Sequence, residues 1–291
     1  GIEPHIWPTI KQIITYYHDG TRYGIRADDD GLITAGEENI QLTWMDAKVG
    51  DWVVTPRRGK PVEINALWYN ALRVSEALAT RFGDVEFSER ADRYAGQVAE
   101  VFGETFWNEE TGCLFDVINP DSNDGSIRPN QILALSLPHR LLNNARERQI
   151  LDVVERELVT PRGLRSLSPG HPSYAGHYGG DQQCRDGAYH QGTVWGWLIG
   201  PFVSAYVRVN GETVQARERA AEFVAPFRSH LYEAGLGQIS EIFDGDAPHA
   251  PRGCYAQAWS VGEVLRCYVE DILGVCPEPW YDRESIAQTG A

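Results

Sequence analysis

The sequence predicts an all-α fold in which antiparallel helical hairpins form a barrel. Apolar residues recur at helical spacing in about eight segments of the 291-residue chain, and convincing strand alternation is not found. Short links alternate with long loops between these segments. Helices paired in this way place their short links on one rim of a barrel and their long loops on the other. Because no strict repeat accompanies the pattern, a helical solenoid is not expected.

The expected helices are bounded by residues that begin or end helices. Pro61 suits the first turn of the helix that follows it, because its nitrogen needs no hydrogen-bond partner there, and Gly83 suits the exit. Ser88, followed by Glu89, is expected to cap the next helix. In chain order, the helices are expected over residues 6–18, 62–82, 88–107, 128–141, 145–158, 193–209, 212–232 and 256–273.

Composition is that of an ordinary globular protein, and length alone leaves one large core or two small ones open. We expect a single domain over residues 1–291, with a loosely attached tail after Pro277. The formal charge of −15 argues against a nucleic-acid partner, because phosphate binding needs a cationic surface. Residues 187–207 include no formally charged side chain, but they contain His190 and Pro201. This stretch therefore fits a buried helix better than a membrane span, and no membrane partner is expected.

The cysteines predict a reducing compartment. They are five in number and widely spread, without a CxxC pair: Cys113, Cys184, Cys254, Cys267 and Cys276. A disulfide framework or a zinc ribbon would show closer, paired spacings. No charged segment followed by an apolar one opens the chain, so nothing suggests secretion. We expect free thiols and a cytoplasmic location.

Two of the long loops each present a carboxylate beside bulky apolar residues. Asp46 lies close to Trp44, Met45 and Trp52 in the first long loop, and Glu241 lies in the third. Apolar surroundings disfavour an ionised carboxyl group, as a general acid requires, and two carboxylates are the minimum for glycoside hydrolysis. Since the chain has 41 acidic residues, spacing alone leaves the alternative of helix caps or surface charges open.

The second long loop and the start of the next helix are rich in polar and aromatic residues. They contain Arg185, Asp186, Tyr189, His190, Gln191, Thr193, Trp195 and Trp197. Donors and acceptors beside aromatic faces suit the hydroxyl groups and ring of a sugar. The same residues also fit a polar loop whose tryptophans belong to the core of the following helix.

Other chemistries receive little support from the sequence. Asp28-Asp29-Asp30-Gly31 resembles part of an EF-hand, but Arg26 would then occupy the first ligand position. We therefore expect no metal site. Neither a GxSxG elbow, a P-loop nor a GxGxxG fingerprint is found, and no cofactor is expected.

Three long stretches, in order between residues 41 and 266, resemble the glycogen debranching enzymes, in their amylo-α-1,6-glucosidase domain. They are QLTWMDAKVGDWVVTPRRGKPVEINALWYNAL, then LRSLSPGHPSYAGHYGG with RDGAYHQGTVWGWLIGPFVSAY, and finally GQISEIFDGDAPHAPRGCYAQAWSVGEVLR. Their length and order make the resemblance far more specific than a single short motif.

The resemblance implies a barrel of six helical hairpins that removes single α-1,6-linked glucose residues from branch points of glycogen or limit dextrin, with inversion. It implies that Asp46 is the general acid and Glu241 the general base. The implied glucose contacts are Trp44, Glu63, Asn65, Trp68, Arg185, Asp186, His190, Gln257 and Trp259.

The chain departs from the family's pattern at its start. Such a barrel has twelve helices, whereas about eight are expected here, so the first two hairpins are expected to be missing. Two alternatives stay open. One is another helical-barrel α-glucosidase, similar to trehalase or glucoamylase, and the other is a non-catalytic fragment that binds α-glucan.

Overall fold

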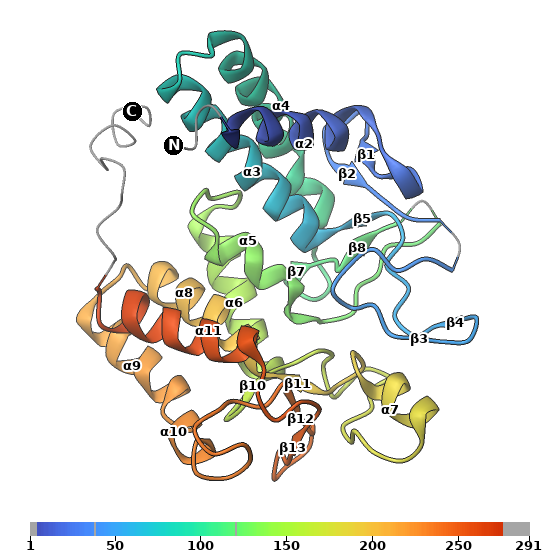
Figure 1. Cartoon of the computed structure of the whole chain (residues 1–291), viewed down its shortest axis with the longest axis vertical. Helices are drawn as coiled ribbons and strands as arrows, with labels where there is room; N and C mark the ends of the chain where they lie inside the picture. The colour runs from blue at the N-terminus through green and yellow to red at the C-terminus, as the bar shows by residue number, and fades with distance from the viewer. Residues whose placement is uncertain (1–4, 38, 120, 276–291) are drawn as a thin grey trace.

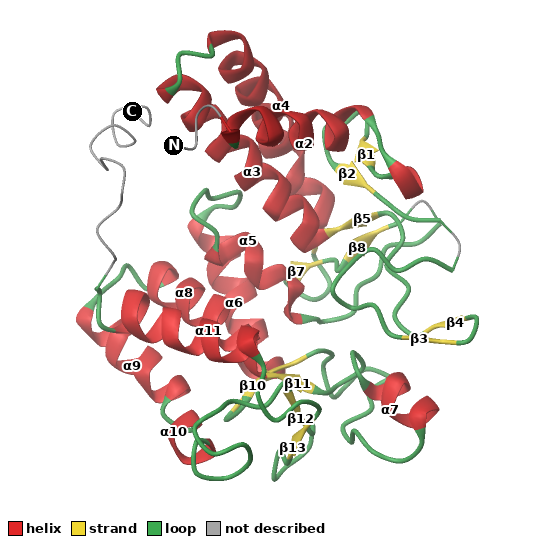
Figure 2. Cartoon of the chain, in the orientation of Figure 1, coloured by secondary structure: helices red, strands yellow, loops and turns green. Residues whose placement is uncertain are grey.

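The structure of the chain is a computed structural model that describes residues 5–37, 39–119 and 121–275. Helices are stacked along one side of the molecule, and loops with short strands gather on the other (Figures 1 and 2). The α-helices are α2 (Trp7–Asp19), α3 (Val62–Arg81), α4 (Val85–Phe106), α5 (Leu133–Ser136), α6 (Asn144–Leu158), α7 (Gln182–Ala188), α8 (Ile199–Val209), α9 (Val214–Val224), α10 (Phe227–His230) and α11 (Ala258–Cys267). The expected tail after Pro277, together with Cys276, lies outside the described residues.

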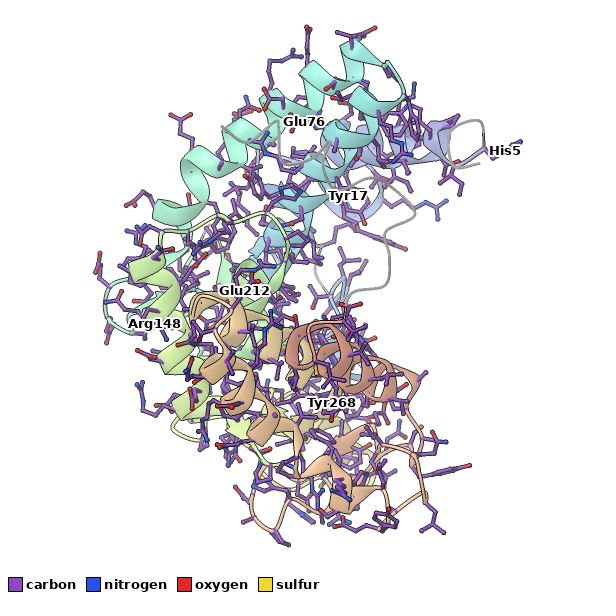
Figure 3. All side chains as sticks on the ribbon, turned by 90° about the vertical axis from the view of Figure 1, so that its left-hand side faces the viewer. His5, Tyr17, Glu76, Arg148, Glu212 and Tyr268 are labelled. Carbon is purple, nitrogen blue, oxygen red and sulfur yellow. The ribbon has the colours of Figure 1, made fainter. Side chains whose placement is uncertain are left out.

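The helices form two groups around one apolar core. Helices α2, α3 and α4 pack together in the first group, while α8 contacts α5, α6, α9 and α11 in the second. Viewed from the side, Tyr17 and Glu76 mark the first group and Arg148 and Tyr268 the second (Figure 3). Phe202 of α8 is fully buried. No helix among the described residues is long and apolar enough to cross a bilayer.

The hairpin of α3 and α4 shows how local signals and tertiary contacts set a helix start. Gly83 has φ +72° at the exit of α3, as the sequence predicts for glycine. Helix α4, however, begins at Val85, and its cap is Asp84, whose carboxylate accepts a hydrogen bond from the Phe87 backbone N–H at 3.3 Å. The predicted cap at Ser88 is wrong. Asp84 also binds Lys11 of α2 at 2.7 Å, which holds the cap in place.

The structure also contains short strands, which the sequence pattern does not indicate. An antiparallel five-stranded sheet, in the order β13-β12-β11-β10-β9, joins the second and third long loops. Its strands have two or three residues each, too few to produce a recognisable alternation. They are β9 (Val159–Thr160), β10 (Gly163–Arg165), β11 (Val194–Trp195), β12 (Ile242–Phe243) and β13 (Pro251–Arg252).

Four two-stranded ladders support the other loops. They pair β1 (Arg26–Ala27) with β2 (Ile33–Thr34), β3 (Lys48–Val49) with β4 (Trp52–Val53), β5 (Lys60–Pro61) with β8 (Val117–Ile118), and β6 (Trp107–Asn108) with β7 (Cys113–Leu114).

Several helices differ from their expected lengths for local reasons. The helix expected from residue 193 begins as a 3₁₀ turn at Gly196–Leu198, because the preceding residues pair as β11. The helix expected over 212–232 is interrupted at Pro226, which separates α9 from α10. Residues 128–141 form only a 3₁₀ turn (Pro129–Ile132) and α5, and the last helix ends in a π-helical turn (Tyr268–Ile272). Helix α7 was not expected.

Candidate active site

Glu241 lies at the start of β12, where its backbone and side chain are both held. Its N–H donates to the Cys254 carbonyl oxygen at 2.9 Å, which fixes the backbone. Carboxylate atom Oε1 accepts from the Tyr189 hydroxyl at 2.5 Å and from Gln257 Nε2 at 3.4 Å. Atom Oε2 accepts from the Cys254 N–H at 2.9 Å. Burial, together with this contact to Glu241, raises the pKa of the Tyr189 phenol far above its ordinary value, so the phenol remains a donor.

An aromatic cluster lies beside this carboxylate. The Trp259 ring stacks on that of Trp197, which in turn meets Trp44 edge-on with centroids 5.3 Å apart. Trp44 also contacts Trp195 edge-on at 5.2 Å, and Tyr189 contacts Trp195 at 4.9 Å. These rings come from the first long loop, from the second long loop and the segment that follows it, and from α11. They therefore place a broad apolar surface next to Glu241, of the kind that packs against a sugar ring.

A cavity of about 570 Å³ adjoins the aromatic cluster, a volume that suits an organic ligand. Trp44, Trp197 and Trp259 form one part of its wall, and the rest comes from α3, α5, α8, α11 and the segments that follow α5 and α11. The remaining lining residues are Glu63, Ile64, Leu67, Leu133, Ser136, Leu137, Pro138, Pro201, Ser204, Arg208, Glu263, Arg266, Glu270 and Asp271.

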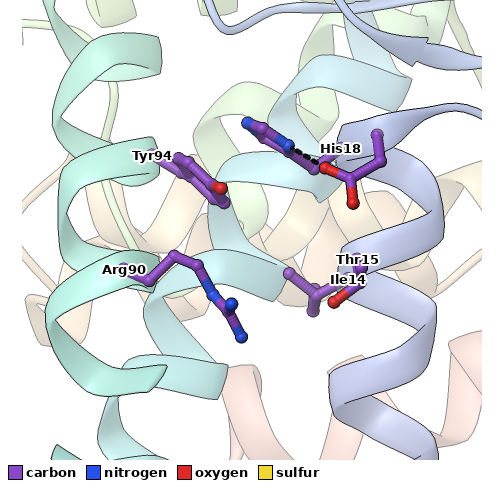
Figure 4. Close-up of a pocket in the computed structure, with 6 residues that line it drawn as sticks. Ile14, Thr15, His18, Arg90 and Tyr94 are labelled. Atoms are coloured by element: carbon purple, nitrogen blue, oxygen red, sulfur yellow. Dashed lines mark hydrogen bonds and ion pairs between the residues drawn. The ribbon is translucent and has the colours of Figure 1, made fainter. Parts of the chain in front are cut away.

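A second cavity, between α2 and α4, is much smaller. Its volume is about 30 Å³, enough for about one water molecule. Its lining includes His18, whose ring stacks on Tyr94 and whose Nδ1 lies 2.7 Å from Asp19 Oδ1 (Figure 4). This cavity is too small for a sugar.

Asp46 lies in an exposed loop position between the buried Met45 and the β3–β4 hairpin. Met45 is 1% exposed and points into the core, whereas Trp52 of β4 is 48% exposed. Asp46 itself is exposed, so the apolar setting expected from its neighbours in the sequence is not found. The hairpin packs on α7, where Trp52 lies over Gly187. Helix α7 leads directly to Tyr189, which contacts Glu241. The same helix thus contacts the hairpin next to Asp46 and positions a hydrogen-bond donor of Glu241.

A buried hydrogen-bond chain anchors the loop of Asp46 from below. Trp44 Nε1 donates to Asn130 Oδ1 at 2.7 Å, and Asn130 Nδ2 donates to Asp116 Oδ1 at 2.7 Å. Arg57 Nε donates to Asp116 Oδ2 at 2.8 Å, and Arg128 Nε lies 3.8 Å from the same oxygen. Burial opposes the charge of Arg57, but Asp116 and Glu63 outweigh burial and raise its pKa above the ordinary value. Of these residues, only Trp44 and Glu63 stood out in the sequence.

Three predicted sugar contacts at the start of α3 have polar groups that are already bonded to other protein groups. Both carboxylate oxygens of Glu63 bind Arg57, with Nη2 to Oε2 at 2.6 Å, although Glu63 also lines the large cavity. Asn65 accepts from the Ile33 N–H at 2.6 Å and donates to the Ile33 carbonyl at 3.0 Å. Trp68 donates to the Gly31 carbonyl at 3.2 Å. Asn65 and Trp68 thus fasten the first long loop to α3.

The remaining predicted contacts divide between α7 and α11. Arg185 of α7 donates to the Gly180 carbonyl at 2.7 Å, and Asp186 follows it in the same helix. His190 is fully buried against Trp195, and burial, with Arg128 and Arg57 nearby, lowers its pKa to about 3. It is therefore a neutral packing residue. Gln257 contacts Glu241, whereas Trp44 and Trp259 both contact Trp197 and line the large cavity.

Tyr189 is a functional candidate that was not among the predicted site residues. It stood in the polar second loop as one of several aromatic residues, and its neighbour His190 was favoured instead. The pairing of β11 with β12 brings this loop beside Glu241, at Trp195↔Ile242 and Val194↔Phe243. Strands this short leave no signal that could have identified the pair.

The family profile described as amylo-alpha-1,6-glucosidase matches residues 2–266. The chain belongs to this family. Glycogen debranching enzyme of Saccharomyces cerevisiae is 24% identical over 323 aligned residues, which cover 92% of this chain and 21% of the yeast enzyme.

Solved structures share the fold of this amylo-alpha-1,6-glucosidase family chain. A family GH78 rhamnosidase of Bacillus sp. GL1 matches with a TM-score of 0.57 and 18% identity over 90% of this chain and 23% of its own. A family GH63 mannosylglycerate hydrolase of Thermus thermophilus, in complex with glucose, matches with a TM-score of 0.51 and 20% identity over 72% and 47%. The chain thus spans less than half the length of these relatives. The predicted fold class is confirmed, and the enzyme class is glycoside hydrolase.

Proposed function

We propose that this chain hydrolyses single α-1,6-linked glucosyl stubs of glycogen or limit dextrin, with inversion. Asp46 acts as the general acid that protonates the departing oxygen, and Glu241 as the general base that takes a proton from the attacking water. An inverting pair needs carboxyl groups about 6.5–9.5 Å apart, which leaves room for that water. The branched α-glucan is the partner, and the chemistry needs no cofactor or metal.

The observation that carries this proposal is the setting of Glu241. Its carboxylate is half-buried beside Tyr189 and Gln257, accepts three hydrogen bonds and makes no salt bridge among the described residues. A carboxylate held by neutral donors keeps its orientation and is not paired with a cation, as suits a general base. Asp46 differs, because it is exposed in a loop that the Trp44–Asn130 hydrogen bond holds.

Supporting residues would bind the glucosyl unit around this pair. Trp44 and Trp259 supply aromatic surface in the cavity wall, and Gln257 supplies an amide beside Glu241. Arg185 and Asp186 of α7 would contact the substrate from the side of the β3–β4 hairpin. Glu63 would act from the opposite wall, with its charge compensated by Arg57. The cytoplasm, where glycogen is stored and thiols stay reduced, is the proposed compartment, and the four described cysteines are free.

The test is release of glucose from a dextrin that carries single α-1,6-glucosyl stubs. The parent chain should release glucose, first as the β-anomer by ¹H NMR, whereas Asp46→Asn and Glu241→Gln should lose at least about 100-fold in kcat. Asp51→Asn, on the exposed turn of the same hairpin, is the matched control and should keep the parent rate.

Other outcomes separate the alternatives. Hydrolysis of trehalose or maltooligosaccharides in place of the branched dextrin would assign another α-glucosidase. Retention on a glycogen affinity gel by the parent and both variants, without glucose release, would assign a binding module and overturn the proposal.

A further inference from the structure

The phenol of Tyr189 is locked in place by its surroundings. Its ring centroid lies 4.9 Å from Trp195, 4.8 Å from His190 and 5.6 Å from Tyr178. Its carbonyl oxygen accepts from Trp195 Nε1 at 3.0 Å, and its N–H donates to the Asp186 carbonyl at 3.3 Å, so the backbone is fixed as well. With ring and backbone held, the hydroxyl remains on Oε1 of Glu241.

The hydrogen bonds divide the two oxygens of Glu241 into different roles. Each carboxylate oxygen has two lone pairs. Oε1 accepts from Tyr189 and from Gln257, so both of its lone pairs are used. Oε2 accepts from the Cys254 N–H, which leaves one lone pair open among the described contacts.

We propose that Tyr189 is a positioning residue that fixes the Glu241 carboxylate and turns Oε2 toward the attacking water. This inference rests on the proposed function, in which Glu241 is the general base. The water gives its proton to Oε2 as its oxygen attacks the anomeric carbon, while the bond from that carbon to the departing oxygen breaks. Tyr189 touches neither sugar nor water and acts through Glu241.

A hydroxyl group that donates to a carboxylate oxygen makes a short, strong hydrogen bond that fixes the carboxylate. Replacing Tyr189 by Phe keeps the ring and removes only this donor. The carboxylate is then less well oriented, so kcat should fall about tenfold. The KM for the stubbed dextrin should change less than about twofold, because Tyr189 does not touch the sugar.

The experiment compares Tyr189→Phe with Tyr174→Phe. Tyr174 lies on the same loop and donates its hydroxyl hydrogen to Asp246 Oδ1 at 3.0 Å, so its variant also removes one phenol-to-carboxylate bond but leaves Glu241 untouched. The kcat and KM values are measured on the stubbed dextrin for both variants and the parent. In parallel, the ¹³C carboxyl resonance of Glu241, assigned by its loss in Glu241→Gln, is recorded under the same conditions in protein labelled with ¹³C-glutamate.

The two readouts distinguish failure of this inference from failure of the proposed function. We expect Tyr189→Phe to lower kcat and to displace the ¹³C resonance of Glu241, and Tyr174→Phe to change neither. An unchanged ¹³C resonance of Glu241 in a folded Tyr189→Phe protein would overturn the inference, whatever the rate. A displaced resonance in a chain whose parent releases no glucose would keep the contact between Tyr189 and Glu241 and refute the function.

Discussion

Trp259 stacks on Trp197 with ring centroids 3.9 Å apart and planes inclined by 12°. Trp197 is buried, whereas Trp259 remains 45% exposed and lines the large cavity. One face of the Trp259 ring is thus fixed by the protein and the other is left open. An aromatic face prepared in this way can bind a sugar ring without a loss of side-chain freedom.

Replacing Trp259 by Ala should therefore weaken substrate binding more than it slows the chemical step. Loss of one stacking surface should raise KM for the stubbed dextrin about fivefold and change kcat less than about twofold. Steady-state kinetics at 25 °C checks this. Tyr16→Ala removes an exposed ring from α2 and should leave both constants unchanged. A fall in kcat at constant KM would contradict the role of Trp259 in binding.

The buried charges around Asp116 predict a large effect on stability. Asp116→Asn leaves Arg57 and Arg128 with one buried counter-charge, that of Glu63, so the free energy of unfolding should fall by about 3 kcal/mol. Urea unfolding measures it. Asp92 pairs with Arg73 at the surface, so Asp92→Asn should cost less than about 0.5 kcal/mol. Equal losses of unfolding free energy in Asp116→Asn and Asp92→Asn would show that burial does not strengthen the ion pairs of Asp116.

Asn130 should influence the rate through the loop of Asp46. Asn130→Ala removes the acceptor of Trp44 Nε1 and a donor to Asp116, so kcat should fall about tenfold as the general acid loses its fixed position. Asn70 is the control, because it is also buried and bonds the backbone of His139 through both its Oδ1 and its Nδ2. Both alanine variants should lose about 2 kcal/mol of stability, but only Asn130→Ala should lose activity. A parallel loss of kcat in Asn70→Ala would refute the specific link.

His190 predicts that stability falls in mild acid. Its pKa is about 3 in the folded chain and 6.5 in its ordinary state, so the unfolded chain binds the proton more tightly. Stability from this group is therefore complete above pH 6.5 and declines as the pH falls toward 3, by about 2 kcal/mol between pH 7 and pH 5. In His190→Gln, this part of the difference in the free energy of unfolding between pH 7 and pH 5, measured with urea, should be absent. His177→Gln, with a largely exposed ring, should keep the parent's dependence, and a His190→Gln protein with the same dependence would contradict the assignment.

Local signals predicted most helices, because the apolar residues that recur at helical spacing lie on one face of each helix and pack into the core. Helix α3 begins at Val62 and ends next to Phe82, as the Pro61 and Gly83 signals indicate. The start of α4 could not be predicted in the same way. Asp84 and Ser88 are both residue types that cap helices, and contacts of Asp84 with Trp7 and Lys11 of α2, more than 70 positions away, decide between them.

The site was less predictable than the fold because its contacts join distant loops. The sequence motifs predicted that Glu241, Gln257 and Trp259 share one site; in the structure Gln257 contacts Glu241, and Trp259 lines the large cavity. The motifs could not show that both carboxylate oxygens of Glu63 bind Arg57. Nor could they show that the side-chain amide of Asn65 hydrogen-bonds to the backbone of Ile33. Helical position tells which way a side chain points, but a partner from an irregular loop has no periodic signature.

The pairing of β11 with β12 has a consequence for how the second and third long loops can move. Trp195 and Ile242 are partners in that ladder, so the loop with Glu241 and the loop with Tyr189 move as one body. Gly163 of β10 adds a close contact with β11, because a Cβ there would collide with the carbonyl oxygen of Trp195. A displacement of Glu241 would therefore carry Tyr189 with it, and the contact between the two residues would survive motion of the loops.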